Sequence, residues 1–428
     1  MRRSHIAFAA VFVLAAVGTS LPVSAGHKKD PRSENLIPVA DSPRPASLGD
    51  GTANSDLAFW KNLAFQGSYE GFRIIDIKNP RKPKELADIT CPGSQGDMSV
   101  WGTLLFRSVD SARMTADCVG EPSQIPFPVG YEGVQIFDVS DPKNTGPDDL
   151  ITAIATCGGS HTHTLVPDVE NDRVFIYVAT SGCPGLMSII EVPLDDPASA
   201  TVSLRPLLPD EIATCHDINV HLGAGLAAGA CNPNVIVWDI SDPAAPQALF
   251  SFTQVGVTSW HSAAFTWDGE VIVTGWEPGG GTQPACQEQN TPTEKSVFFW
   301  SATDGSFLGS FEFPQDQSAT ENCTVHNYNV VPLRNRYLLV SSYYQGGTNV
   351  VDFTDPADAF QVAWSDPQPI EPEADGGAWS SYWYNGFIYE SDITEGLNVF
   401  YLKDPSTKKA LKLDHLNPQT QETLIPSR

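Results

Sequence analysis

The stretch GVQIFDVSDP at residues 133–142 decides the fold, because copies of it return along the chain. Each copy has an aliphatic run, an aspartate, one or two further residues and then Asp-Pro or Asn-Pro. The clearest copies are GFRIIDIKNP at 71–80, VIVWDISDP at 235–243 and VVDFTDP at 350–356. Degenerate copies end at Pro197 and Pro405, and a divergent one surrounds Trp300, which makes seven units. Their spacing is comparable to the roughly 40–50 residues of a propeller blade.

Each unit repeats the same order of short strands. A first strand is followed by a turn, a second aliphatic strand, the Asp-Pro strand and a final strand such as LITAIA at 150–155. Asp-Pro suits the turn, since proline fixes φ and aspartate accepts local backbone hydrogen bonds. The pattern predicts an all-β, seven-bladed β-propeller of four-stranded antiparallel blades, braced by disulfides. Six blades stay open as an alternative, because the unit around Trp300 is weak.

The repeats also divide the chain. The propeller is expected over 54–403, between an N-terminal segment at 26–53 and a C-terminal tail at 404–428. The last unit has no obvious fourth strand. The stretch NLIPV at 35–39 would supply it, close the ring and protect an open sheet edge.

Residues 1–25 have the pattern of a cleaved secretory signal peptide. Arg2 and Arg3 precede an apolar run, and small residues end at Ala25. About a dozen apolar residues are too few to span a bilayer, which needs about 20. The chain ends in a polar tail, so no stable membrane anchor is expected. The predicted location is secreted or extracellular.

Composition limits the partners. A hydrophobic content of 41% with 10% aromatic residues excludes a disordered chain. The formal net charge of −26 argues against a nucleic-acid partner, because phosphate recognition needs clustered positive charge. The expected partner is a small ligand or an extracellular protein, neither of which the sequence identifies. A closed ring buries its own edges, so we expect a monomer.

The cysteines predict disulfides. All eight follow the predicted signal peptide, and an even number suits an oxidising compartment. No Cys-x-x-Cys pair occurs, which weakens a thiol-redox or cysteine–zinc interpretation. Many pairings are allowed, but the repeat favours neighbours. The favoured pairs are Cys91–Cys118, Cys157–Cys183 and Cys215–Cys231, with Cys286–Cys323 linking adjacent blades.

The repeated phrase resembles that of the LVIVD-repeat family of exported bacterial propeller proteins. The resemblance covers about Asp56 to Leu402 and is most faithful at Asp76, Asp138, Asp239 and Asp352. It implies the propeller fold and export, and it implies little about activity, because a fold by itself dictates no chemistry. Methanethiol oxidases of the selenium-binding-protein family, which hold copper with channel histidines, are similar in architecture only.

Histidines recur at one position of the first strands. When these strands are aligned on their last large apolar residue, the residue four positions earlier is informative. In chain order it is Asp56, Asp97, His161, His216, His261, His326 and Trp379. First strands line the central channel of a propeller, so these side chains should meet near one mouth. Glu70 and Glu132, in matching Tyr-Glu-Gly turns, are expected on the same face.

Converging imidazoles and carboxylates are the ligands that a divalent transition metal prefers. The predicted metal ligands are His161, His216, His261, His326, Asp97 and Glu132, and the candidate metals are copper, zinc and iron. The preferred interpretation is an exported binding or scaffold protein with a metal or ligand site. A metal-dependent extracellular enzyme, an oxidoreductase or a hydrolase, is the alternative. In a third interpretation the histidines only form structural hydrogen bonds between blades.

Overall fold

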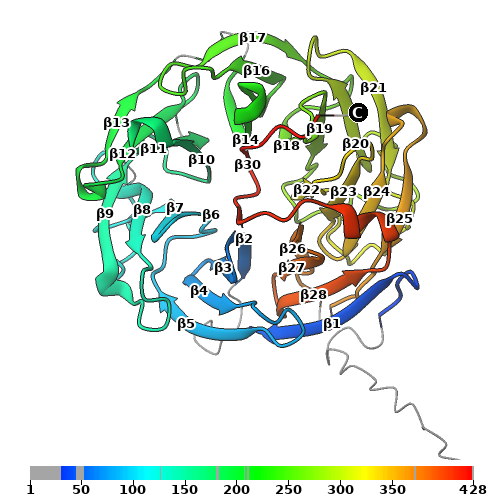
Figure 1. Cartoon of the computed structure of the whole chain (residues 1–428), viewed down its shortest axis with the longest axis horizontal. Coiled ribbons are helices and arrows are strands. Elements are labelled where there is room, and N and C mark those ends of the chain that lie inside the picture. The colour runs from blue at the N-terminus through cyan, green and yellow to red at the C-terminus, as the bar shows by residue number, and fades with distance from the viewer. Residues whose placement is uncertain are drawn as a thin grey trace, which may run out of the picture.

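Seven sheets stand around a central channel, as Figure 1 shows. The computed structural model describes residues 30–44, 53–125, 127–179, 183–206, 208–209, 212–370 and 373–426, so the predicted signal peptide lies outside the described residues. Every sheet contains four antiparallel blade strands. The prediction of an all-β, seven-bladed propeller is confirmed, and the six-bladed alternative is wrong because the divergent unit around Trp300 forms a complete blade.

Each blade runs from an inner strand at the channel to an outer strand at the rim. From the channel outward, the first three are β2(Asn54–Trp60), β3(Leu63–Ser68), β4(Gly71–Asp76) and β5(Lys84–Thr90); β6(Met98–Trp101), β7(Leu104–Arg113), β8(Tyr131–Asp138) and β9(Leu150–Ala155); and β10(Thr162–Asp168), β11(Arg173–Ala179), β12(Ser188–Pro193) and β13(Thr201–Leu204). The next two are β14(Thr214–His221), β15(Leu226–Asn232), β16(Val235–Asp239) and β17(Gln247–Phe252); and β18(Trp260–Phe265), β19(Val271–Trp276), β20(Ser296–Ser301) and β21(Phe307–Glu312). The last two are β22(Tyr328–Val330), β23(Leu338–Ser342), β24(Thr348–Asp352) and β25(Phe360–Trp364); and β26(Ala378–Tyr384), β27(Phe387–Asp392), β28(Gly396–Leu402) and β1(Leu36–Pro43).

Helices are short and lie in the connections. The 3-10 helices of the described chain are Pro147–Asp149, Val169–Asn171, Pro197–Ser199, Leu222–Ala224, Pro356–Asp358 and Pro405–Lys409. The repeated aspartates form turns as expected. Asp138 accepts a hydrogen bond of 2.8 Å from the Ser140 backbone N–H, and Asp239 accepts the equivalent bond from Ser241. The signature aspartate therefore ends a strand and takes no part in a site.

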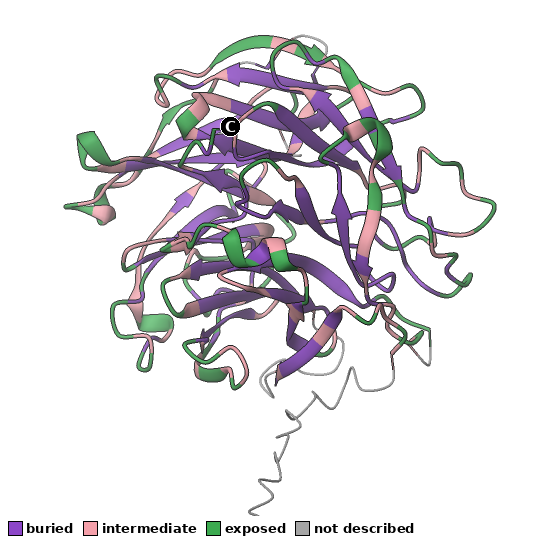
Figure 2. Cartoon of the chain, turned by 45° about the vertical axis from the view of Figure 1, so that its right-hand side comes forward, coloured by how far each residue is buried: buried purple, intermediate pink, exposed green. Residues whose placement is uncertain are grey.

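The core lies between neighbouring blades. Aromatic pairs such as Phe72 with Phe137, at 5.1 Å between ring centroids, join the facing sides of adjacent sheets. Figure 2 shows that burial falls from the inner strands, which are mostly buried, to the outer strands and loops, which carry the exposed residues. Burying both faces of each inner strand fixes the position of its backbone, and this makes the channel wall a rigid support for side chains.

The N-terminal strand closes the ring. Strand β1 pairs antiparallel with β28 and is the outermost strand of the last blade. The buried guanidinium of Arg73, on β4 of the first blade, donates hydrogen bonds of 2.7 Å to the Pro43 carbonyl and 3.0 Å to the Ser42 carbonyl. The closing strand is therefore fixed to the blades on both sides of the closure.

The C-terminal tail crosses the channel, which the sequence did not indicate. After the last blade, β29(His415–Leu416) pairs with the end of β2, and β30(Thr420–Gln421) pairs with the end of β14. Figure 1 shows this red segment passing through the centre of the ring. Asn417 binds both backbone groups of Val100 on β6, and Gln421 binds both backbone groups of Phe265 on β18. The tail therefore covers one end of the channel.

The cysteine pairing is as expected. The four disulfides are Cys91–Cys118, Cys157–Cys183, Cys215–Cys231 and Cys286–Cys323, and the last one joins adjacent blades. They brace the connections at the end of the channel opposite to the tail. Within the described residues, no helix has the length and hydropathy that crossing a membrane requires.

Candidate metal centre

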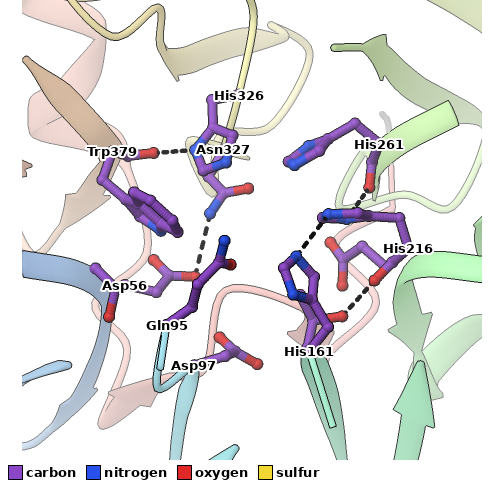
Figure 3. A pocket seen from close by; sticks show the side chains of 12 residues that line it. Asp56, Gln95, Asp97, His161, His216, His261, His326, Asn327 and Trp379 are labelled. Carbon is purple, nitrogen blue, oxygen red and sulfur yellow. Dashed lines mark hydrogen bonds between the residues drawn. The ribbon is translucent and has the colours of Figure 1, made fainter. Parts of the chain in front are cut away.

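All seven aligned positions meet at the start of the inner strands. Asp56, Asp97, His161, His216, His261, His326 and Trp379 line one small void on the channel axis, as Figure 3 shows. Backbone irregularities place several of these side chains. The ladder shifts register at His216 in β14, at His261 in β18 and at Trp379 in β26. A β-bulge leaves one residue outside the ladder and re-aims its side chain, here toward the channel.

Three of the four histidines have one ring nitrogen fixed by an oxygen acceptor. His161 Nδ1 lies 2.7 Å from Asp110 Oδ2, and His216 Nδ1 lies 3.0 Å from the carbonyl oxygen of His261. His326 Nδ1 binds the carbonyl oxygen of Trp379. A carbonyl or carboxylate oxygen only accepts, so each Nδ1 carries the proton. Metal-binding histidines use the same arrangement, because it orients the ring and leaves Nε2 as the ligand atom.

The free nitrogens of two rings face each other. His161 Nε2 lies 2.9 Å from His216 Nε2. Since both rings use Nδ1–H as a donor, both Nε2 atoms present a lone pair when the rings are neutral. Two lone pairs at this distance repel each other unless a positive ion, a proton or a metal, lies with them. The four rings continue around the channel, with centroids 3.9 Å apart for His216 and His261 and 4.5 Å apart for His261 and His326.

Burial favours the neutral form of three of the rings. It lowers the pKa of His216 and of His261 well below the ordinary value, and neighbouring histidines add to the effect. Burial also lowers the pKa of His326 to about 3. A neutral imidazole is the form that binds a metal ion. His261 Nδ1 is buried without a hydrogen-bond partner, so this ring has a further nitrogen available.

Glu277 completes the cluster, and sequence reasoning missed it. Ligand atoms of His216, His261 and Glu277 lie within 4.8 Å of one another. The carboxylate oxygens of Glu277 lie 3.6 Å from His261 Nε2 and 3.7 Å from His326 Nε2. Tyr344 donates a hydrogen bond of 2.6 Å to Glu277, and burial raises the pKa of Glu277 to about 7. Its position directly after a second strand, on the face of the histidines, was the available signal.

A cavity of about 720 Å³ opens over the histidines. The four rings, Glu277 and Gln95 form its polar side, and Trp379, Tyr69, Tyr344 and Ile393 form an apolar side. Gly281 belongs to the wall. A Cβ atom at Gly281 would lie 2.4 Å from the Tyr344 hydroxyl and 2.7 Å from a Glu277 oxygen, so glycine is required there. The volume lies within the range of about 300–1,000 Å³ typical of small-molecule sites.

The remaining predicted ligands do not border the large cavity. Asp97 lines the small void but not the large cavity, and its Oδ2 accepts a hydrogen bond of 2.8 Å from the His163 backbone N–H. Glu132 lines neither space; its carboxylate accepts a bond from the Phe127 N–H in the long β7–β8 connection. Glu70 also lines neither space. The structure therefore groups the four histidines with Glu277, and not with Glu132.

Two other histidines near the same strands are structural. His163 is fully buried and binds the Ser99 and Ser108 hydroxyls at 2.7 Å each, between two blades. His221 accepts from the Ala224 N–H and donates to the Trp267 carbonyl near the other end of β14. His161 and His163 are only two residues apart in the sequence, so the register alone distinguishes a site histidine from a structural one.

Comparisons with known proteins extend to the fold. No family model matches the chain, and no curated protein matches it. The β-propeller domain of Cps50 (Swd1) from Myceliophteria thermophila superposes with a TM-score of 0.53 at 9% identity, over 87% of this chain and 99% of that one. Raptor from Chaetomium thermophilum gives a TM-score of 0.52 at 8% identity, over 83% of this chain and 28% of that one. Identities this low carry over the propeller architecture alone.

Proposed function

We propose that this chain is an exported binding protein of the LVIVD-repeat type that holds a divalent transition metal at the mouth of its channel. The proposed ligands are His161, His216, His261, His326 and Glu277. One observation carries the proposal: His161 Nε2 and His216 Nε2 lie 2.9 Å apart while both Nδ1 atoms are used as donors. The four disulfides support export, since they form in oxidising compartments.

The donor set suits copper, zinc or iron. Imidazole nitrogens select these metals, whereas calcium and magnesium prefer sites made only of oxygen. Two ligands about 2.1 Å from one ion, at roughly a right angle, lie about 3 Å apart, which is near the observed separation of the two Nε2 atoms. The bonds to Asp110, to the His261 carbonyl and to the Trp379 carbonyl would hold the rings in their ligating orientation.

An enzyme is the second candidate, and the cavity favours it. A space of about 720 Å³ borders the proposed ligands on the side away from the tail. A metal at this place would polarise a bound ligand as a Lewis acid or exchange electrons with it. In an enzyme whose metal is held by the histidines alone, Glu277, whose pKa burial raises to about 7, would exchange protons near neutral pH as a general acid or base. Structural sites are closed, whereas catalytic sites keep a coordination position open to the ligand.

Metal analysis tests the proposal. The mature protein, purified from the export compartment without a chelator or a histidine tag, should contain about one copper, zinc or iron ion per chain. The double variant His216→Ala/His261→Ala should contain none, and Glu277→Gln should bind the metal about tenfold more weakly. The control His415→Ala removes a histidine at the tail end and should keep the full content.

A protein that binds no transition metal would contradict the proposal. If the purified protein contains none of these metals and binds none on titration with copper(II), zinc(II) or iron(II), the two facing nitrogens share a proton and the metal proposal is wrong. Binding of azide to the metal-loaded protein, detected by its absorption spectrum, distinguishes an open coordination position from a closed one.

Mass spectrometry of the mature chain should give Gly26 as its first residue.

A further inference from the structure

Three carboxylates from different blades face the small void on the channel axis. They belong to Asp56 on β2, Asp97 just before β6 and Asp217 on β14, and all three residues are at most 5% exposed. In Figure 3 the labelled Asp56 lies across the void from His216 and His261, and Asp97 lies at its edge beside His161. These carboxylates do not line the large cavity. They therefore lie deeper in the channel than the proposed metal centre.

No cationic side chain among the described lining residues pairs with these carboxylates. Among the described residues that line the void there is no lysine or arginine. Asp56 is bound by neutral donors, the Tyr382 hydroxyl at 2.7 Å and the Leu57 N–H at 2.8 Å. Asp217 accepts one bond of 2.8 Å from the Ile218 N–H. Buried charges in proteins are normally paired or bind a metal, because an isolated one is costly.

One carboxylate oxygen of the group is buried without a hydrogen-bond partner. Asp97 Oδ1 is buried and accepts no hydrogen bond, although Asp97 Oδ2 accepts one from His163. The void measures about 10 Å³, which is about the space that a single water-sized particle occupies. Ser55, Thr162 and Asn327, whose side chains carry neutral oxygens, also line the void, together with the four imidazoles. Calcium and magnesium prefer oxygen donors, which the three carboxylates supply.

We propose that Asp56, Asp97 and Asp217 bind one hard divalent cation, calcium before magnesium, on the channel axis between the histidines and the C-terminal tail. Its ligands differ from those of the proposed transition-metal centre, whose four histidines line both this void and the large cavity. The C-terminal tail closes this site at the tail end of the channel, since Gln419 Nε2 donates a hydrogen bond of 3.4 Å to Asp56 Oδ2. The ion would join the first, second and fourth blades at the axis, where no strand pairing links them.

Calcium binding tests this proposal directly. The protein as purified is analysed for calcium and magnesium, dialysed against EDTA, and then titrated with calcium chloride while heat and melting temperature are recorded. We expect one ion per chain and a melting temperature that rises with calcium concentration, by the mass-action law for a ligand of the folded state. Asp97→Asn should bind calcium at least tenfold more weakly. Asp141→Asn removes an exposed aspartate and should behave as the wild type.

Two further variants keep the result decisive. Asp56→Asn repeats the test from another blade if Asp97→Asn does not fold. His216→Ala/His261→Ala should lose the transition metal and keep the calcium response, so failure of either site is seen separately. The proposal is overturned if the wild type contains neither ion, gains no stability in calcium or magnesium chloride, and melts below Asp97→Asn at equal salt. That pattern would mean that protons, and not a cation, neutralise the carboxylates.

Discussion

The unpaired backbone groups of the inner strands are bound in different ways at the two ends of the channel. Inner strands of a propeller present backbone groups to the channel that no neighbouring strand pairs. At one end the tail binds them: the Val220 N–H donates to the Gln419 carbonyl at 2.8 Å, and Thr420 donates to the Leu165 carbonyl at 2.6 Å. At the other end side chains bind them: the His216 ring donates to the His261 carbonyl at 3.0 Å, and Thr162 donates to the His216 carbonyl at 2.5 Å.

This difference shows how one scaffold holds both a seal and a site. A chain segment that pairs with the strands fills the channel and excludes a ligand. Side chains that make the same bonds leave the middle of the channel open and keep a second ring nitrogen free. The site end is therefore fixed by its own histidines, and the sealed end by the tail. Changes at the two ends should accordingly have different consequences.

The largest effect is expected from removing the tail. Deleting residues 415–428 removes the hydrogen bonds to five inner strands and uncovers the apolar residues that Leu416 and Ile425 contact. At about 1 kcal/mol for each net hydrogen bond and about 2 kcal/mol for each buried aliphatic side chain, the free energy of unfolding should fall by at least about 5 kcal/mol. Urea unfolding measures it, with Leu424→Ser, at an exposed position, as the control. Wild-type stability in the truncated chain would contradict the sealing role.

Smaller effects are expected from replacing His161 or His163, which lie two residues apart. One replacement should mainly lower stability, and the other should mainly weaken metal binding. His163→Ala leaves the buried Ser99 and Ser108 hydroxyls without their partner and should lower the free energy of unfolding by about 2–4 kcal/mol, with unchanged metal content. His161→Ala should weaken metal binding at least tenfold and cost less stability, because its side chain is 25% exposed. Urea unfolding and elemental analysis separate the two. If both variants lose the metal equally, the distinction between site and structural histidines fails.

The smallest effect concerns the anchor of the tail and depends on pH. Burial opposes ionisation of Asp404, but hydrogen bonds from Ser406 and the ion pair with Arg336 outweigh it and hold the pKa of Asp404 below its ordinary value. Its contribution is therefore present above the unfolded-state pKa of about 3.9 and is lost as the pH falls through the lower folded-state pKa. Because the pair is partly exposed, the contribution should be below about 1 kcal/mol.

The variant Asp404→Asn tests the direction of this pH dependence. In urea unfolding from pH 6 to pH 3, the wild type should lose more stability than the variant at the acid end. The difference in the free energy of unfolding between the two proteins should be largest at pH 6. Two curves that stay parallel over the whole range would show that Asp404 ionises equally in the folded and unfolded chain. Asp141→Asn is the exposed control away from the tail.

Repetition determined what the sequence could predict. The spacing of the Asp-Pro phrases aligned the first strands, so His161, His216, His261 and His326 were placed together correctly, and the cysteine pairs followed from the same alignment. Features outside the repeat were missed. Glu277 lies at the start of a long insert that no other blade shares, and its approach to His326 depends on the path of that insert.

The tail and Glu132 illustrate the same limit. Asn417, Gln419 and Gln421 contact strands hundreds of residues earlier, and no local pattern specifies such contacts. Glu132 was placed at the site because its turn matched that of Glu70, but the long β7–β8 connection gives its carboxylate a closer donor in Phe127. A repeat predicts what its copies share, and each insertion replaces that prediction with its own contacts.

Each of the three imidazoles whose Nδ1 is fixed is oriented by a group of a neighbouring blade. His161 is oriented by Asp110, His216 by the backbone beside His261, and His326 by the backbone beside Trp379. The spacing of the four rings is thus set by the circumference of the whole ring, which β1 and Arg73 close far from the axis. If the propeller were loosely closed, these nitrogens would lie at the wrong separation. The outermost strand of the molecule therefore helps to set the geometry at its centre.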